Sequence, residues 1–96
     1  MLELRPICEN CGKALPANSA EAMICSFECT FCRSCVQNTL HNVCPNCGGG
    51  FEKRPIRPKQ YLEKNPMSVK IVFKPVHPEQ LAKLWQRYKD MNPEQR

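Results

Sequence analysis

Eight cysteines in four close pairs are the residues of this 96-residue chain with the clearest chemistry. Three pairs are spaced C-x-x-C and one C-x-x-x-C. Two thiolates on one tight turn can reach the same tetrahedral metal ion, whereas such close cysteines are poorly placed for an ordinary disulfide. Glycine follows the first and last pairs and can adopt the positive φ that turns backbone N–H groups toward the sulfurs. The candidate metal ligands are Cys8, Cys11, Cys25, Cys29, Cys32, Cys35, Cys44 and Cys47.

Zinc is favoured over two other uses of these cysteines. Two four-cysteine sites, with two Zn²⁺ per chain, account for all eight thiols. An iron–sulfur cluster is the first alternative, but the run Cys29-x-x-Cys32-x-x-Cys35 is followed by eight residues before Cys44-Pro45, where a ferredoxin has three. Four disulfides would require a secreted protein. The chain begins without the apolar stretch of a signal peptide, so we expect it in the reducing cytoplasm.

The same donor sets argue against an enzyme. Four sulfurs complete a tetrahedral site and leave no position for water or substrate, so we expect structural metal ions. Asp90 is the only aspartate, and we find no nucleophile–base pair and no glycine-rich phosphate loop. No run approaches the roughly 20 apolar residues of a membrane span. The sequence therefore predicts a non-enzymatic protein with neither a cofactor other than zinc nor a membrane anchor.

Composition indicates that metal ions stabilise a small fold. Hydrophobic residues make up 42% of the chain, but that share includes the eight cysteines, and a chain this short buries little apolar surface. Loading eight thiolates with two zinc ions would lower the formal net charge of +5 to about +1. The first 50 residues hold three basic and four acidic side chains, and the rest hold eleven and five. The chain thus has an acidic head in its first 50 residues and a basic tail in the rest. Because its positive charge is confined to the tail, net charge alone is a weak argument for nucleic-acid binding.

Spacing leaves the grouping of the cysteines open, because four pairs can fill two sites as neighbours, nested or interleaved. The full pattern, C-x2-C-x13-C-x3-C-x2-C-x2-C-x8-C-x2-C, resembles a RING finger with cysteine as its fourth ligand. The resemblance includes Phe31 before the fifth ligand, Val36 after the sixth, and Leu40 in the expected helix. It implies interleaved sites, with Cys8, Cys11, Cys32 and Cys35 at one zinc and Cys25, Cys29, Cys44 and Cys47 at the other.

A second resemblance covers about residues 1–60. The segments MLELRP at residues 1–6, ICSFECTFC at 24–32 and VCPNCGGG at 43–50 are similar to a small family of bacterial proteins of unknown function. This resemblance implies a bacterial, RING-like or treble-clef zinc module without a known activity. Ubiquitin-ligase activity is disfavoured, because Glu9-Asn10 stands where RING ligases usually place an apolar residue, and Gly48 stands where they place a basic one.

Two short elements are expected to position the cysteines. Residues 21–25 predict a strand that enters the second pair. Residues 34–41 predict a helix, because Val36 and Leu40 are four apart on one face. His41 is interpreted as a solvent-facing residue at the helix end, since the eight cysteines already complete two sites.

The basic, proline-rich residues 53–67 predict an extended linker, or an arm lying on the zinc head. Its basic side chains are Lys53, Arg54, Arg57, Lys59 and Lys64. They could track phosphates of a nucleic acid, but we favour their keeping the arm soluble and pairing with the acidic head.

Residues 68–96 predict a strand and a helix. Val69, Ile71 and Phe73 alternate within residues 68–74, as in a strand. Pro78 opens an amphipathic helix over residues 79–91, whose apolar stripe is Leu81, Leu84, Trp85, Tyr88 and Met91. We expect this stripe to pack on the zinc head, although it could instead bind a partner or a second copy of the chain.

Together these features predict a small, metal-stabilised α+β protein. A RING-like two-zinc head occupies residues 1–52, the basic arm residues 53–67, and the strand and amphipathic helix residues 68–96. We expect a zinc-binding module that mediates protein–protein interaction, with an unidentified protein partner. Nucleic-acid binding through the arm is the alternative, and ubiquitin-ligase-like activity is less favoured.

Overall fold

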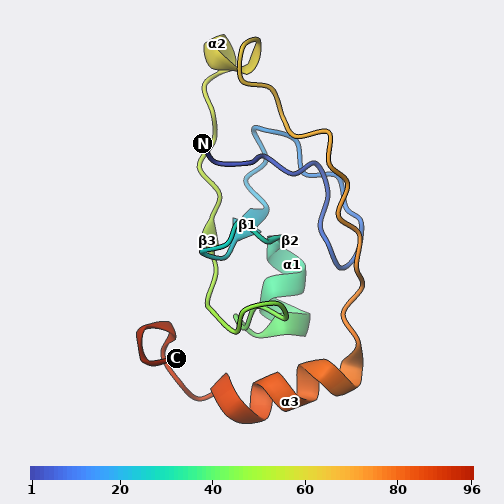
Figure 1. Ribbon diagram of the computed structural model, residues 1–96, viewed down its shortest axis with the longest axis vertical. Coiled ribbons are helices and arrows are strands. Elements are labelled where there is room, and N and C mark those ends of the chain that lie inside the picture. Colours follow the sequence, from blue (N-terminus) through green and yellow to red (C-terminus); the bar gives the residue numbers. More distant parts are fainter.

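A three-stranded antiparallel sheet lies at the centre of the computed structural model, which describes residues 1–96 (Figure 1). Its strand order is β2-β1-β3, with β1 at Ala22–Ile24, β2 at Thr30–Cys32 and β3 at Glu52–Lys53. In this sheet Met23 is paired with Phe31 on one side and with Lys53 on the other. The strand predicted over residues 21–25 is confirmed, and the protein is a small α+β fold.

The helix predicted over residues 34–41 is also confirmed. Helix α1 (Arg33–Cys35) continues without a break into the π-helical turn η1 (Val36–Leu40). Val36 and Leu40 are both buried, as their spacing predicts. The helix ends where His41 takes a left-handed conformation with φ of 49°. His41 is exposed, and its ring lies edge-on against Trp85 with centroids 4.7 Å apart.

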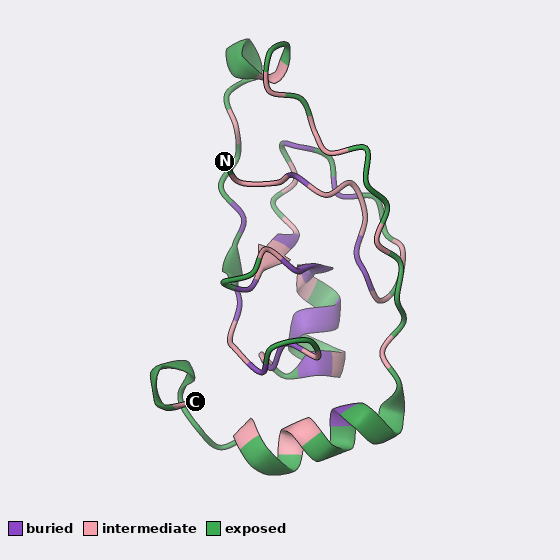
Figure 2. Cartoon of the chain, viewed as in Figure 1, coloured by how far each residue is buried: buried purple, intermediate pink, exposed green.

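Sulfur makes up much of the hydrophobic core. Six of the thirteen residues in the buried cluster are cysteines. The remainder includes Phe31 and Phe51, whose rings meet edge to face at 5.4 Å. Figure 2 shows buried residues in β2, in the helix that follows it and along the N-terminal loops, whereas β3 and the segments that lead to and follow α2 are mostly exposed. Because the cysteines are part of the core, an ion bound to them would also stabilise the fold.

The basic arm is tied to the head through its arginines. Strand β3 reaches into residues 53–67, and Arg54, which follows it, is only 1% exposed. Its guanidinium donates hydrogen bonds of 2.8 to 3.1 Å to the backbone carbonyls of Arg5, Leu15 and Pro16. Arg57 likewise donates to the carbonyls of Leu2 and Asn65. These two side chains satisfy backbone acceptors, so they are not free to track phosphates.

Replacing Arg54 by methionine is expected to lower the free energy of unfolding by about 3 kcal/mol, because three carbonyl oxygens lose a charged donor. Burial already lowers the pKa of Arg54, yet the group stays charged, so its hydrogen bonds are strong. Chemical denaturation of the metal-loaded protein would measure the change. Lys53→Met, at the exposed neighbouring position, is the matched control. Equal denaturation midpoints for the two variants would contradict this prediction.

The strand predicted over residues 68–74 is wrong. The chain returns along one side of the molecule, from helix α2 (Lys59–Leu62) to the far end, and residues 68–74 are extended but belong to no sheet (Figure 1). Val69, Ile71 and Phe73 are 94%, 62% and 56% exposed. The alternating pattern correctly indicated an extended backbone. A ladder also needs a neighbouring strand, and this segment has none.

Helix α3 (Pro78–Tyr88) packs on the head, as the apolar stripe predicts, and Pro78 forms its first turn. Leu81 is 5% exposed within the core, and the Trp85 indole N–H donates to the Leu40 carbonyl at 3.0 Å. The helix ends at Tyr88, three residues before the predicted end, and Met91 is exposed. A short 3-10 turn, η2 (Pro93–Gln95), follows. None of the helices has the length and apolar character needed to cross a bilayer.

Candidate metal centres

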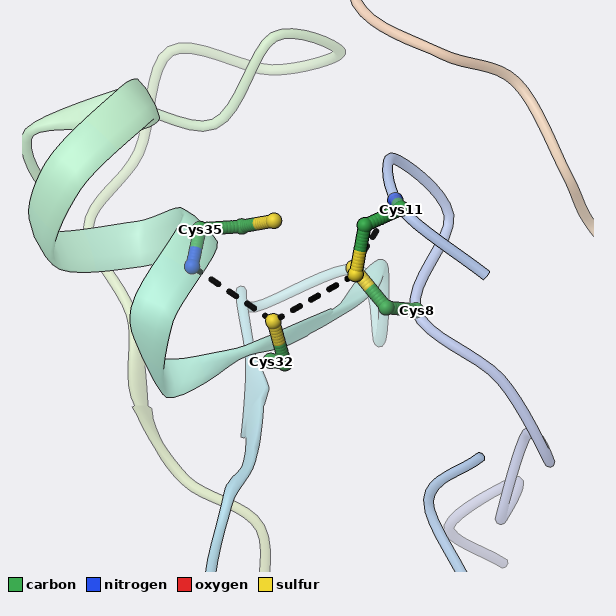
Figure 3. Close-up of side chains that lie close together, drawn as sticks. All are labelled: Cys8, Cys11, Cys32 and Cys35. Carbon is green, nitrogen blue, oxygen red and sulfur yellow. Dashed lines mark hydrogen bonds between the residues drawn. The ribbon is translucent and has the colours of Figure 1, made fainter. Parts of the chain in front are cut away.

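The first cluster of thiols joins the first and third cysteine pairs. Cys8 and Cys11 lie on the N-terminal loop, Cys32 ends β2, and Cys35 lies in α1. Their four sulfur atoms are all within 4.8 Å of one another and point toward a common centre (Figure 3). The Cys11 and Cys32 sulfurs are 3.7 Å apart. A tetrahedral zinc ion with Zn–S bonds of about 2.3 Å places its sulfurs about 3.8 Å apart, so the cluster has the size of a single-ion site.

The second cluster joins the second and fourth pairs. The sulfurs of Cys25, Cys44 and Cys47 lie within 4.8 Å of one another. Cys29 is the fourth thiol and lies at the edge of this group, outside that mutual distance. Its sulfur accepts a hydrogen bond of 3.4 Å from the Asn46 side chain, which holds it beside the loop of the fourth pair. The thiols are thus grouped in the interleaved manner that the resemblance implied and that spacing left open.

Backbone amides point at the sulfurs in both clusters. Within the pairs, the N–H of Cys11 lies 3.5 Å from the Cys8 sulfur, and that of Cys35 lies 3.5 Å from the Cys32 sulfur. Beyond the pairs, the amides of Phe27 and Gly49 lie 3.4 Å from the sulfurs of Cys25 and Cys47. Such donors stabilise thiolate over thiol. The arrangement is that of loops built to hold anionic sulfur.

The predicted positive φ at the glycines is confirmed. Gly12 has φ of 77° and Gly48 has φ of 78°. At Gly48 there is a second constraint, because a Cβ would lie 2.7 Å from the ring of Tyr88 in α3. Glycine therefore allows both the turn and the close approach of the C-terminal helix to the second cluster.

Two asparagines complete the donor sets, and sequence reasoning missed them. Asn10 stands inside the first pair and donates to the Cys35 sulfur at 3.4 Å. Asn46 stands at the same place in the last pair and donates to Cys29. Each amide thus links the two pairs of its own cluster. The signal in the sequence was their shared position, directly before the second cysteine of a C-x-x-C pair.

We expect Asn46→Ala to weaken metal binding at the second cluster by about 10- to 100-fold, the usual effect of removing an outer hydrogen bond to a metal ligand. Competition with a chromophoric chelator would measure the change. Asn38→Ala is the matched control, because Asn38 is an exposed asparagine whose amide donates only to the Ser34 hydroxyl. Equal affinities for the two variants would count against a role for Asn46 in holding Cys29.

Glu9 links the two clusters and was also missed as a structural residue. It is 2% exposed and lies between Cys8 and Cys11 in sequence. One carboxylate oxygen accepts from the Thr30 amide at 2.9 Å and from the Arg5 guanidinium at 3.1 Å. The other accepts from Asn46 at 3.3 Å. The carboxylate therefore joins the first loop to β2 and to the loop of the second cluster.

Burial dominates the electrostatics of the thiols. It raises the pKa of Cys29, Cys32, Cys35 and Cys44 above the ordinary value. Burial alone would also raise the pKa of Cys11, but hydrogen bonds from the Lys13 backbone and the neighbouring thiols outweigh it and lower the pKa. Each cluster has one exposed cysteine, Cys11 in the first and Cys47 in the second. Buried thiols of this kind ionise only when a cation replaces their protons.

Acidification is expected to destabilise the metal-loaded protein, because protons compete with the ion for the thiolates. The opposite trend holds for metal-free thiols. A pKa raised by folding favours the folded state below the unfolded pKa of about 8.5, and that stability is lost as the pH rises through the folded pKa. Melting temperatures of the protein as purified, between neutral and mildly acidic pH, distinguish metal-bound from metal-free thiols. A melting temperature that holds or rises on acidification would contradict metal-bound clusters.

The N-terminal part of the chain matches a known protein family. A family described as a protein of unknown function, DUF1272, matches residues 1–57. A relative from Rhizobium meliloti (strain 1021), described as an uncharacterized protein, is 53% identical over 75 residues, which are 78% of this chain and 89% of the relative. No solved structure gives a significant match. The matched residues include all eight cysteines of this chain, and the chain therefore belongs to the DUF1272 family.

Proposed function

We propose that this chain is a non-enzymatic zinc-binding module of the reducing cytoplasm, in which two structural Zn²⁺ ions hold a RING-like head and the head carries a protein-binding surface. The main support is the first cluster, where four sulfurs lie within 4.8 Å of one another. A tetrahedral ion bound to four thiolates has no open position for water or substrate. The function that fits such a site is to stabilise a scaffold.

Zinc suits these donors better than an iron–sulfur cluster. Tetrahedral sites with four sulfur ligands hold either zinc or iron. A cluster places several iron and sulfide atoms between its cysteines, whereas the Cys11 and Cys32 sulfurs lie 3.7 Å apart, close enough to share one ion. Both clusters also use glycine-terminated C-x-x-C loops whose amides point at sulfur, at Gly12 and Gly48.

Native mass spectrometry with metal analysis, on protein purified under reducing conditions, tests the zinc proposal. The expected result is a colourless protein with two zinc ions per chain. A brown protein containing iron and sulfide would replace the proposal with electron transfer. Cadmium or cobalt substitution offers a second readout, because a tetrahedral thiolate site gives Co²⁺ intense visible absorption.

Scaffolding is preferred to ligase chemistry because of what lies between the first two ligands. Glu9 is buried and bonded to the head, and the Asn10 amide oxygen accepts from the Val76 N–H at 2.9 Å. Neither side chain offers the apolar contact on which a conjugating enzyme would dock. We expect no discharge of ubiquitin from a charged conjugating enzyme in a single-turnover assay; stimulated discharge would overturn the non-enzymatic assignment.

A further inference from the structure

The extended segment of residues 68–74 is hydrogen-bonded to the N-terminal segment only at its two ends. The amide of Ser68 donates to the Leu4 carbonyl at 2.9 Å, and that of Lys74 donates to the Glu9 carbonyl at 2.7 Å. Just beyond, the Val76 amide donates to Asn10. All three donors are even-numbered; between them the Lys70 amide donates only to the Ser68 hydroxyl, and the Val72 amide is unpaired. Since successive N–H groups of an extended chain point to opposite edges, these bonds fix which edge faces the N-terminal segment.

The odd-numbered amides face the other edge. The N–H groups of Val69, Ile71 and Phe73 donate to no backbone or side-chain acceptor in the chain, and no carbonyl between residues 68 and 74 accepts a hydrogen bond. Such a row of unpaired groups is a template for another strand. Peptides bind to folds by β-pairing with such exposed backbone groups, and here the groups lie on an extended segment outside the sheet.

The side chains on this segment fit the same use. Val69, Ile71 and Phe73 repeat every second residue and are 94%, 62% and 56% exposed. Branched and aromatic residues with this period are typical of a strand whose face is covered. In Figure 2 the segment descends the outside of the molecule as an almost continuous exposed stretch. A pairing strand would satisfy the amides, and its own side chains would pack beside the apolar stripe on the same face.

We propose that residues 68–74 form a docking strand for an extended, acidic peptide segment of a partner protein. Charge identifies this occupant. Between residues 59 and 74 the chain has one acidic side chain, Glu63, and four exposed lysines, Lys59, Lys64, Lys70 and Lys74. The inference deepens the proposed function, since it identifies the surface and the chemistry of the protein that binds there.

A second copy of the chain is a poor occupant. Antiparallel pairing about Ile71 would place Lys70 and Lys74 of both copies on one face of the pair. Diagonal neighbours on such a face are about 7–8 Å apart, and like charges that close oppose pairing. An acidic strand places glutamate or aspartate at the same positions.

Amide hydrogen exchange, followed by NMR on the full metal-loaded chain, tests the docking strand directly. The probe is an acetylated and amidated eight-residue peptide that alternates glutamate and valine. At saturating peptide, exchange at Val69, Ile71 and Phe73 is expected to slow at least tenfold, while Ser68 and Lys74, already bonded, change little. The same peptide with lysine in place of glutamate is the matched probe, and it is expected to leave all five amides unchanged.

Two variants separate backbone pairing from simple apolar contact. Ile71→Pro removes the central outward N–H, and we expect the affinity for the acidic peptide to fall at least tenfold. Ile71→Thr keeps the N–H and the branched side chain, so its loss is expected to be smaller. Residue 71 is exposed, so we expect the NMR spectrum of the head to be unchanged in both variants. This control shows that the substitutions alter only residues 68–74. Equal losses in the two variants would overturn β-pairing.

Several results would overturn the proposal. Protection at the odd-numbered amides that grows with protein concentration, without peptide, would identify a second copy as the occupant. Equal protection by a single-stranded oligonucleotide would identify a nucleic acid. Unchanged exchange in a folded sample with two zinc ions would refute the docking strand alone. A folded sample without zinc would refute the zinc proposal instead, because exchange and metal content are measured on the same sample.

Discussion

Complete removal of metal by a chelator is expected to unfold residues 8–47. The thiols account for six of the thirteen buried core residues, and the rest of the core is too small to hold the chain alone. Structural zinc contributes about 10–16 kcal/mol per site in zinc-finger peptides at neutral pH, which exceeds the roughly 5–15 kcal/mol net stability of a typical domain. Without the ions, four raised-pKa thiols remain packed together with no attraction to replace the metal bonds.

Amide NMR spectra before and after chelation, in a reducing buffer, measure this unfolding. The dispersed resonances of the sheet and of α1 are expected to collapse to the narrow range of an unfolded chain. Addition of stoichiometric Zn²⁺ should restore them, which excludes irreversible oxidation as the cause. A spectrum that stayed dispersed after complete metal removal would show that the apolar contacts suffice.

Replacing Cys35 by serine is expected to empty the first site and to destabilise the second, so that the metal content falls below one ion per chain. The reason is that the two clusters share the β1–β2 hairpin: Cys25 and Cys29 lie in its turn, and Cys32 ends its second strand. Glu9 adds a further link, since it bonds to β2 and to Asn46. Loss of the first site therefore removes a support of the second.

Metal analysis by native mass spectrometry, together with the amide spectrum, measures the effect of Cys35→Ser. Ser26→Ala is the matched control, because Ser26 is exposed beside Cys25 and contributes no hydrogen bond to the clusters. The control is expected to retain both ions. A Cys35→Ser protein that kept one ion and the dispersed resonances of residues 25–47 would show that the clusters fold independently.

The local parts of the site could be predicted because they depend on short-range geometry. A C-x-x-C pair followed by glycine specifies a turn wherever it occurs, as Gly12 and Gly48 confirm. The strand entering Cys25 and the helix with Val36 and Leu40 were also predictable, since their periodicity lies within a few residues. The apolar stripe of α3 likewise indicated packing, which Leu81 and Trp85 confirm.

The features that the sequence did not predict depend on contacts between distant segments. The spacing of the cysteines contains no information on which loops the hairpin brings together, so the grouping required a resemblance. The extended residues 68–74 had the pattern of a strand, but a ladder requires a neighbour that the pattern does not specify. Arg54 stands among prolines and lysines, typical of a solvated stretch, and only the folded chain places it against carbonyls 38 to 49 residues away.

The single exposed sulfur in each cluster determines how the ions would exchange. The other cysteines of both clusters are buried, and only Cys11 and Cys47 are open to solvent. An incoming competitor thiol or chelator can therefore begin ligand substitution at one corner of each site, while the remaining bonds stay shielded by the core. Stepwise substitution from that corner leaves the first intermediate still held by three thiolates. Exchange in the folded protein would thus begin at the exposed sulfur of each cluster. It would be slow, because local opening must uncover the three buried sulfurs before the ion can leave.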